Sequence, residues 1–340
     1  MKTTLKLVPV ILVAAAAACA TAGRGSASRP SWIDGDSALW PRAAYVLGVG
    51  SADDDTQAAE RARGEVARVF SAAVSVDTSL SESESNSSAT GRTFSQNVSE
   101  NVRSATKKVL EGVDIVARWK DPSTGVCYAL AALEKGKALE AVQEKTQALD
   151  KDAAEWKGRL DAASDRFDKA KAAAKLAALL KARLSLENDR RVLGGGPMPS
   201  TVDASAAKAA ADQALAALNV VVAAEGDGAS EVVTGIVSGL DAAGLHAKRG
   251  AESDPSDMTA TARVTVEPFA GGDPRWKWSR ASATVTLQDG RDRKDFARFE
   301  VSDREASADA GEARQRALKE TAKKAAEKVS AAINAFFVDQ

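Results

Sequence analysis

The stretch that decides the fold of the first domain is Tyr45-Val46-Leu47-Gly48-Val49-Gly50-Ser51-Ala52, followed by Asp53-Asp54-Asp55-Thr56. The apolar run predicts a β-strand, and its glycines end that strand. The acidic residues and Thr56 supply the N-cap and first-turn chemistry of a helix. One apolar stripe then recurs at helical spacing to about residue 73 and consists of Ala58, Ala62, Val66, Val69 and Ala73.

Further elements complete a first domain over residues 30–133. Apolar and polar residues alternate from Val74 to Leu80, which predicts a second strand. The spacing of the apolar residues from Phe94 to Val109 predicts a second helix. Two strands, 113–119 and 126–133, follow across a turn at 120–125.

The first domain resembles a known family through four short motifs: Pro30-Ser31-Trp32, the 45–52 stretch with its two glycines, Trp119, and Tyr128-Ala129-Leu130. Together with the alanine-spaced helix, these motifs are similar to the LPP-twenty lipoprotein family over about a third of the chain. The resemblance implies a small α/β domain of envelope lipoproteins, some of them linked to flagella and surface assemblies. It implies no catalytic residues.

The N-terminus, residues 1–18, has the composition of a secretory signal. A short basic segment precedes an apolar run of about a dozen residues, which is too short to cross a bilayer. Ala16-Ala17-Ala18-Cys19 resembles a lipobox, although it lacks the usual Leu three residues before the cysteine. We therefore expect Cys19 to be acylated, for example with palmitate, and residues 19–29 to form a tether.

The cellular location expected for the exported chain depends on the residues around Cys19. Ala20 follows the cysteine, which resembles the outer-membrane default of Gram-negative lipoproteins. We expect a chain anchored in the outer membrane that faces the periplasm. The alternative is cleavage after Ala20-Thr21-Ala22, which would release a soluble periplasmic protein.

A helical segment occupies residues 134–193 and carries a heptad pattern. One seam contains Leu139, Thr146, Ala153, Leu160, Phe167 and Ala174, and the other contains Val142, Leu149, Trp156, Ala163, Ala170, Ala177 and Leu184. This spacing favours coiled-coil packing. Two arrangements fit: an antiparallel hairpin turning near 162–165, or one helix about 85 Å long that pairs with a second copy through residues 134–191.

A Gly/Pro linker at 194–200 precedes a C-terminal domain over residues 201–340. Helices are predicted at 204–217 and 230–243, with strands at 220–223 and 245–249. Three alternating strands follow at 258–266, 276–287 and 296–301, the last two joined through Asp289-Gly290, and a helix from 308 to 337 closes the chain. The fold class is therefore α+β. In its order of elements this domain is similar to the N-terminal domain of TolB.

Composition and motifs argue against an enzyme or a nucleic-acid-binding protein. The 46 Lys and Arg nearly balance the 47 Asp and Glu, without a basic block. The single histidine, His246, has no second histidine for a metal site or triad. Gly48-Val49-Gly50 lacks the third glycine of a dinucleotide fingerprint, and Asp53-Asp54-Asp55 is better explained as helix capping than as a Ca²⁺ site. Cys127 lies in an apolar run, as a buried thiol would.

Two tryptophans are the candidate partner-binding residues. Trp276 and Trp278 fall in the opposite phase from the apolar residues Ala281 to Leu287 of the same predicted strand. Either a β-bulge near Ser279 returns both indoles to the core, or they form a platform on the other face that contacts a protein or a glycan strand.

The sequence thus predicts a non-catalytic envelope lipoprotein without a cofactor or metal, acting as a structural or adaptor component of a motility, secretion or surface assembly. The alternative is a regulatory binding module that activates an envelope enzyme such as a cell-wall synthase. The identity of the partner does not follow from the residues.

Overall fold

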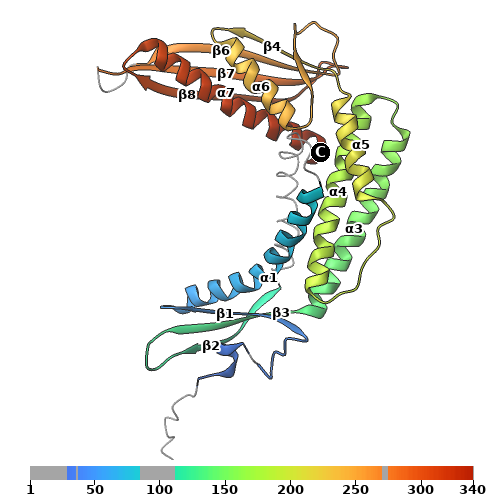
Figure 1. Ribbon diagram of the computed structural model, residues 1–340, viewed down its shortest axis with the longest axis vertical. Helices are drawn as coiled ribbons and strands as arrows, with labels where there is room; N and C mark the ends of the chain where they lie inside the picture. The colour runs from blue at the N-terminus through green and yellow to red at the C-terminus, as the bar shows by residue number, and fades with distance from the viewer. Residues whose placement is uncertain (1–28, 36, 85–111, 270–274, 340) are drawn as a thin grey trace, which may run out of the picture.

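The computed structural model describes residues 29–35, 37–84, 112–269 and 275–339. Two sheet-containing modules lie at opposite ends of a pair of long helices (Figure 1). The fold is α+β, as the sequence predicts.

The N-terminal module is a three-stranded antiparallel sheet with one helix on it. Its described elements are η1 (Ser31–Asp34), β1 (Tyr45–Ala52), α1 (Asp55–Glu84), β2 (Val113–Lys120) and β3 (Cys127–Glu134), with strand order β1-β3-β2. Asp54 caps α1, because its carboxylate accepts a hydrogen bond from the N–H of Gln57 at 2.8 Å. Of the predicted stripe, Ala58, Ala62 and Val66 are buried against the sheet, but Val69 is exposed and the neighbouring Phe70 is buried instead.

The strand expected at 74–80 is wrong, because these residues belong to α1. The alternation there involves only three apolar residues and Thr78. Once a capped helix has formed, each further residue adds a hydrogen bond at little cost. The helix expected at 94–109 lies outside the described residues.

The central segment is an antiparallel hairpin of α3 (Lys135–Ala162) and α4 (Arg166–Val192). Ala163 has extended dihedral angles, and the Asp165 side chain accepts hydrogen bonds from the N–H groups of Phe167 and Asp168. The hairpin prediction is confirmed, and the single continuous helix is wrong. The missed signal was Asp165, an N-cap residue that starts a new helix without a glycine or proline.

The linker after α4 folds back onto the hairpin. Gly194 adopts a left-handed φ of 82°, which ends the helix. Arg183, which is buried, pairs with Asp150 at 2.6 Å and donates to the Met198 carbonyl at 2.7 Å. Helix α5 (Ala204–Ala216) then packs along α4, so the chain stays in contact with the hairpin after the linker.

The C-terminal module is a five-stranded mixed sheet with helices on one face. Its elements are β4 (Val220–Gly226), α6 (Ala229–Ala242), β5 (Ala247–Arg249), β6 (Met258–Phe269), β7 (Lys277–Asp289), β8 (Asp295–Ser307), α7 (Ala310–Asn334) and a π-helical turn, η2 (Ala335–Asp339). The strand order is β5-β4-β6-β7-β8, with the first three parallel and the last three an antiparallel meander. The predicted hairpin at Asp289-Gly290 is confirmed.

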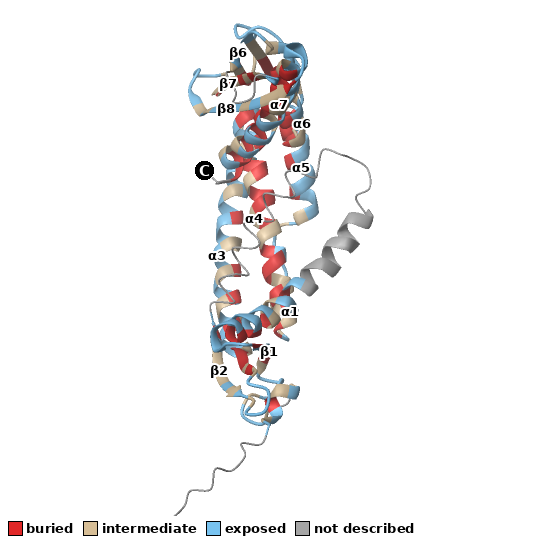
Figure 2. Cartoon of the chain, turned by 90° about the vertical axis from the view of Figure 1, so that its left-hand side faces the viewer, coloured by how far each residue is buried: buried red, intermediate tan, exposed pale blue. Residues whose placement is uncertain are grey.

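The hairpin contributes side chains to the cores of both modules. Near one end, Ala138, Val142 and Leu186 belong to the core of the N-terminal module. Near the turn, Phe167 and Ala174 belong to the core of the C-terminal module. Figure 2 shows buried residues along α4 from one module to the other. The hairpin is therefore a strut built into both ends of the molecule.

Candidate functional site

The C-terminal sheet has one face covered by helices and one face that the helices leave open. In β7, Ala281, Ala283, Val285 and Leu287 are fully buried in the core with α6 and α7. The residues between them point the other way, since side chains alternate along a strand. We call this second surface the outer face. It consists of Thr261, Arg263, Thr265, Glu267 and Phe269 of β6, Trp278, Arg280, Ser282, Thr284 and Thr286 of β7, and Arg298, Glu300, Ser302, Arg304 and Ala306 of β8.

Trp278 lies on the outer face. The pairing of β7 with both neighbours runs without a shift from Trp278 to Leu287, so there is no bulge at Ser279. Ser279 itself is buried on the helix side. Trp276 precedes the strand and is 47% exposed. Of the two arrangements that the sequence allowed, the one that returns the indoles to the core through a bulge is wrong.

Two arginines of the outer face stand opposite each other on neighbouring strands. Arg280 of β7 pairs in register with Arg304 of β8. Both guanidinium groups lie over the ring of Phe269, at 5.0 Å and 4.7 Å from its centroid. Glu267 of β6 is the register partner of Arg280 on its other side, although no ion pair within the described ranges joins a carboxylate to either arginine. This pair was missed from the sequence, because strand register decides which residues of β6 and β8 lie beside the tryptophans.

Hydroxyl side chains occupy the rows next to the arginines. Thr265, Ser282 and Ser302 form one row across β6, β7 and β8. In the row beyond it, Arg263 is paired with Glu225 of β4 at 2.6 Å. The outer face is thus polar along most of its length and aromatic at the end that carries Phe269 and Trp278.

The free edge of the same sheet is partly closed by lysines of α7. Lys324 donates to the Ser302 carbonyl at 3.1 Å, and Lys328 donates to the Glu300 carbonyl at 3.0 Å. Lys324 also pairs with Asp303 and lowers the pKa of that carboxyl, against the opposing effect of its burial. Charged side chains on an edge strand oppose pairing with a further strand. The outer face, rather than this edge, is the surface open to a partner.

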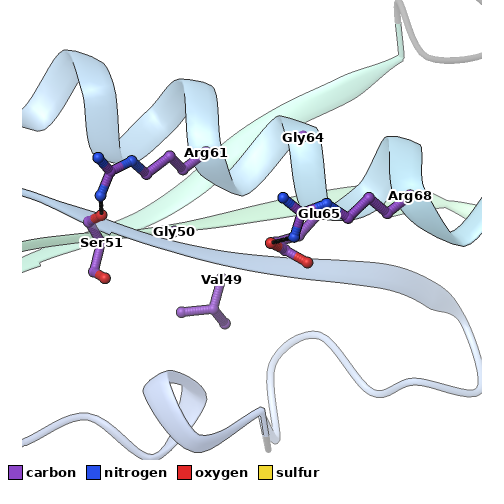
Figure 3. Close-up of a pocket in the computed structure, with 7 residues that line it drawn as sticks. All are labelled: Val49, Gly50, Ser51, Arg61, Gly64, Glu65 and Arg68. Atoms are coloured by element: carbon purple, nitrogen blue, oxygen red, sulfur yellow. Dashed lines mark hydrogen bonds and ion pairs between the residues drawn. The ribbon is translucent and has the colours of Figure 1, made fainter.

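A shallow recess of about 300 Å³ lies between β1 and α1 (Figure 3). Its lining is Val49, Gly50, Ser51, Arg61, Gly64, Glu65 and Arg68. Arg61 donates to the Ser51 carbonyl at 2.6 Å, and Glu65 and Arg68 form an ion pair. The Val49 side chain points away from α1 (Figure 3). The charged groups of the recess therefore satisfy the free edge of β1 and one another, and the recess does not bring a nucleophile and a base together.

The two glycines of β1 have a packing role. A Cβ atom at Gly50 would overlap the backbone of Ala58 and Ala62, and a Cβ at Gly48 would overlap the Ala62 carbonyl. These glycines let α1 lie directly on the strand. The glycines of the family motif are thus the residues that allow the close approach of α1 to β1.

The remaining residues singled out in the sequence lie apart from one another. His246 is exposed, 3.8 Å from Asp241. Cys127 is buried, and burial raises the pKa of its thiol. Within the described ranges, no cluster of His, Cys, Asp and Glu fits a metal ion, and no helix is long and apolar enough to cross a membrane. Cys19 lies outside the described residues.

The residues that carry the family resemblance meet around β3. Trp119 and Tyr128 are cross-strand partners with ring centroids 5.5 Å apart. Trp32 of η1 is buried, and η1 contacts β3. Trp119 and Tyr128 thus lie on the face of the sheet that α1 does not cover, whereas the motif glycines Gly48 and Gly50 lie on the face that it covers.

Comparison with known proteins finds solved structures of low sequence identity that resemble parts of this chain. A search of curated proteins finds no match. Among solved structures, a candidate lipoprotein of Caulobacter crescentus is 20% identical, covering 34% of this chain and 87% of its own, with a TM-score of 0.25. A secreted protein of Helicobacter pylori is 13% identical, covering 84% and 97%, with a TM-score of 0.42. A minor lipoprotein of Acinetobacter baumannii is 12% identical, covering 33% and 90%, with a TM-score of 0.26.

The family assignment rests on the sequence model that matches the N-terminal module. Residues 30–134 match the model described as LPP20 lipoprotein, in agreement with the resemblance seen in the motifs. Residues 30–134, the N-terminal module, are therefore similar to the LPP20 lipoprotein family.

Proposed function

We propose that the chain is a non-catalytic adaptor lipoprotein of the outer membrane, in which the hairpin holds the outer face of the C-terminal sheet at a distance from the lipid anchor. The observation that carries this proposal is the strut. Each helix of the hairpin has 27 or 28 residues, which at 1.5 Å per residue spans about 40 Å.

The direction of the chain supports this arrangement. The first described residues lie at the end of the molecule formed by the N-terminal module, and the C-terminal sheet lies at the other end (Figure 1). An anchor at Cys19 would be joined to Arg29 by about ten residues, at most about 35 Å when extended. The N-terminal module would then stand near the membrane, and the outer face would point into the periplasm.

Contacts at the turn of the hairpin support a fixed distance between the modules. Arg291, in the β7–β8 turn, pairs with Asp165 and Asp168 at 3.0 Å and lies 4.7 Å from the centroid of Phe167. Phe167 also packs against Phe337 of η2, with centroids 5.5 Å apart. These contacts join α4 to the C-terminal module through charge, cation–π and apolar packing together.

The anchor is tested by metabolic labelling with a palmitate analogue. The wild-type chain should carry label and fractionate with the outer membrane, whereas Cys19→Ala should lose the label and become soluble, since acyl chains provide the attachment. Cys127→Ala is the matched control, because Cys127 is buried, and it should label like the wild type. Equal labelling of wild type and Cys19→Ala, or an unlabelled soluble wild type, would contradict the proposal.

A further inference from the structure

The pair Arg280 and Arg304 is the feature of the outer face that calls for a ligand. Residues directly opposite on antiparallel strands have Cβ atoms about 5 Å apart, and like charges in that position destabilise the sheet. The ring of Phe269, over which both guanidinium groups lie, and the carboxylate of Glu267, the register partner of Arg280, offset part of this repulsion. An anion bound by both groups would offset the rest, and the planar guanidinium group suits a carboxylate, which it can bind with two parallel hydrogen bonds.

We propose, building on the adaptor function above, that Arg280 and Arg304 bind carboxylates of the peptide-bearing glycan of the bacterial cell wall. Trp278 shares a row with Phe269, next to the arginines, and the exposed Trp276 precedes it. Amphipathic aromatic rings provide flat contact area for sugar rings. The row formed by Thr265, Ser282 and Ser302 offers hydroxyl groups that can exchange hydrogen bonds with those of a glycan.

The charge pattern favours a glycan chain over a phospholipid surface. The outer face carries Glu267 and Glu300 among its arginines, and Arg263 is neutralised by Glu225. Binding to a continuous anionic membrane grows with the number of basic residues facing it, and acidic residues oppose it. Discrete carboxylates spaced along a polymer can meet the arginine pair from the Arg304 side, away from Glu267. The C-terminal sheet also lies at the far end of the molecule from the N-terminal module (Figure 1).

The test is cosedimentation of the purified Cys19→Ala chain with isolated cell-wall sacculi. The parent chain should pellet with sacculi, and Arg280→Gln/Arg304→Gln should bind at least tenfold more weakly. The matched control is Arg63→Gln/Arg68→Gln, which removes the same charge from exposed positions of α1 and should bind within twofold of the parent. Trp276→Ala should weaken binding without changing the melting temperature, because the side chain is half exposed. Equal pelleting of the parent and Arg280→Gln/Arg304→Gln would overturn the proposal.

Two further arms identify the ligand group. Sacculi whose carboxylates have been converted to amides should no longer pellet the parent chain. Vesicles of phosphatidylglycerol should not bind it at the same ionic strength. Retained binding to amidated sacculi, or preferential binding to the vesicles, would overturn the proposal. Since the Cys19→Ala chain carries no anchor, these outcomes are independent of the labelling experiment, and either proposal can fail alone.

Discussion

The N-terminal and C-terminal sheets are both covered by helices on one face, and they differ on the other. In the N-terminal sheet the middle of the second face is apolar, although Asp114 and Glu134 lie toward one end of it. Leu130 lies there beside Val49 and Ala117, and it is fully buried because η1 packs on β3. In the C-terminal sheet the second face carries threonines, serines and arginines, and no described element covers its middle.

The second face of the N-terminal sheet has a structural role, whereas the second face of the C-terminal sheet is open to solvent. An apolar sheet face must be covered by the chain itself, as the Trp32 segment covers β3. A polar sheet face is stable in water and is available to a partner. The aromatic and arginine cluster at one end of the polar face is therefore the exception that points to binding, whereas the aromatic pair Trp119 and Tyr128 belongs to the packing of the family domain.

The largest expected effect tests whether the two second faces differ in burial. Leu130→Ala should destabilise the protein by about 3 kcal/mol, because the side chain is fully buried and its removal leaves a cavity. Thr284→Ala, the matched change on the outer face, should change stability by about 0.5 kcal/mol or less. Urea unfolding followed by circular dichroism measures both. Similar losses of stability for the two variants would mean that the two faces do not differ in burial.

A smaller effect tests how closely the helix lies on the first sheet. Gly50→Ala should destabilise by about 2 kcal/mol, because its Cβ would overlap backbone atoms of α1 that cannot move away alone. Gly64 lies in α1, and no atom lies within 4 Å of a Cβ added there. Gly64→Ala should therefore stabilise the protein by about 0.5 kcal/mol. Thermal melting of the two variants measures the contrast. If Gly50→Ala were neutral, the close packing of α1 on β1 would be refuted.

The smallest effect concerns charge at the joint between sheet and strut. The hydrogen bond from Arg291 lowers the pKa of Asp289, so this carboxylate stabilises the fold above its unfolded pKa of about 3.9 and loses that contribution as pH falls through the lowered value. Asp289→Asn should cost about 1 kcal/mol at pH 7 and nearly nothing at acidic pH.

The control for this pH dependence is Asp114→Asn in the N-terminal sheet. Asp114 is exposed and has no ion pair among the described residues. Its stability difference from wild type should be small at every pH. Denaturant titrations between pH 7 and pH 2.5 distinguish the two variants, and a loss for Asp289→Asn that did not shrink toward acid would contradict the assigned cause.

Local signals were enough to predict most elements. Asp54 and the alanine stripe located α1, and Asp289-Gly290 located the β7–β8 hairpin. The alternation in β7 separated Trp278 from the core residues. These features depend on residues close in the sequence, where capping, periodicity and turn chemistry act. Prediction failed at residues 74–80, where a short alternation competed with the continuation of a helix.

The arginine cluster needed information that a sequence alone does not contain. Phe269 meets Arg280 and Arg304 only because β6, β7 and β8 pair in one particular register. If one of these strands shifted by one residue, its side chain would point to the opposite face of the sheet from the other two. The choice between the hairpin and the single helix stayed open because both arrangements bring the heptad residues to a helix–helix contact. In the hairpin most of these residues are at least partly buried, but Leu184 is exposed. Asp165 decides between them through two backbone hydrogen bonds.

The strut that enters both cores also acts as a lever. Because α4 is packed into the N-terminal core at one end and the C-terminal core at the other, it cannot tilt without carrying both modules with it. A tilt of about 10° over its length of about 40 Å moves the far end by about 7 Å. A pull on the outer face would therefore reach the N-terminal module as a torque on β1 and α1, where Gly50 leaves little room between strand and helix.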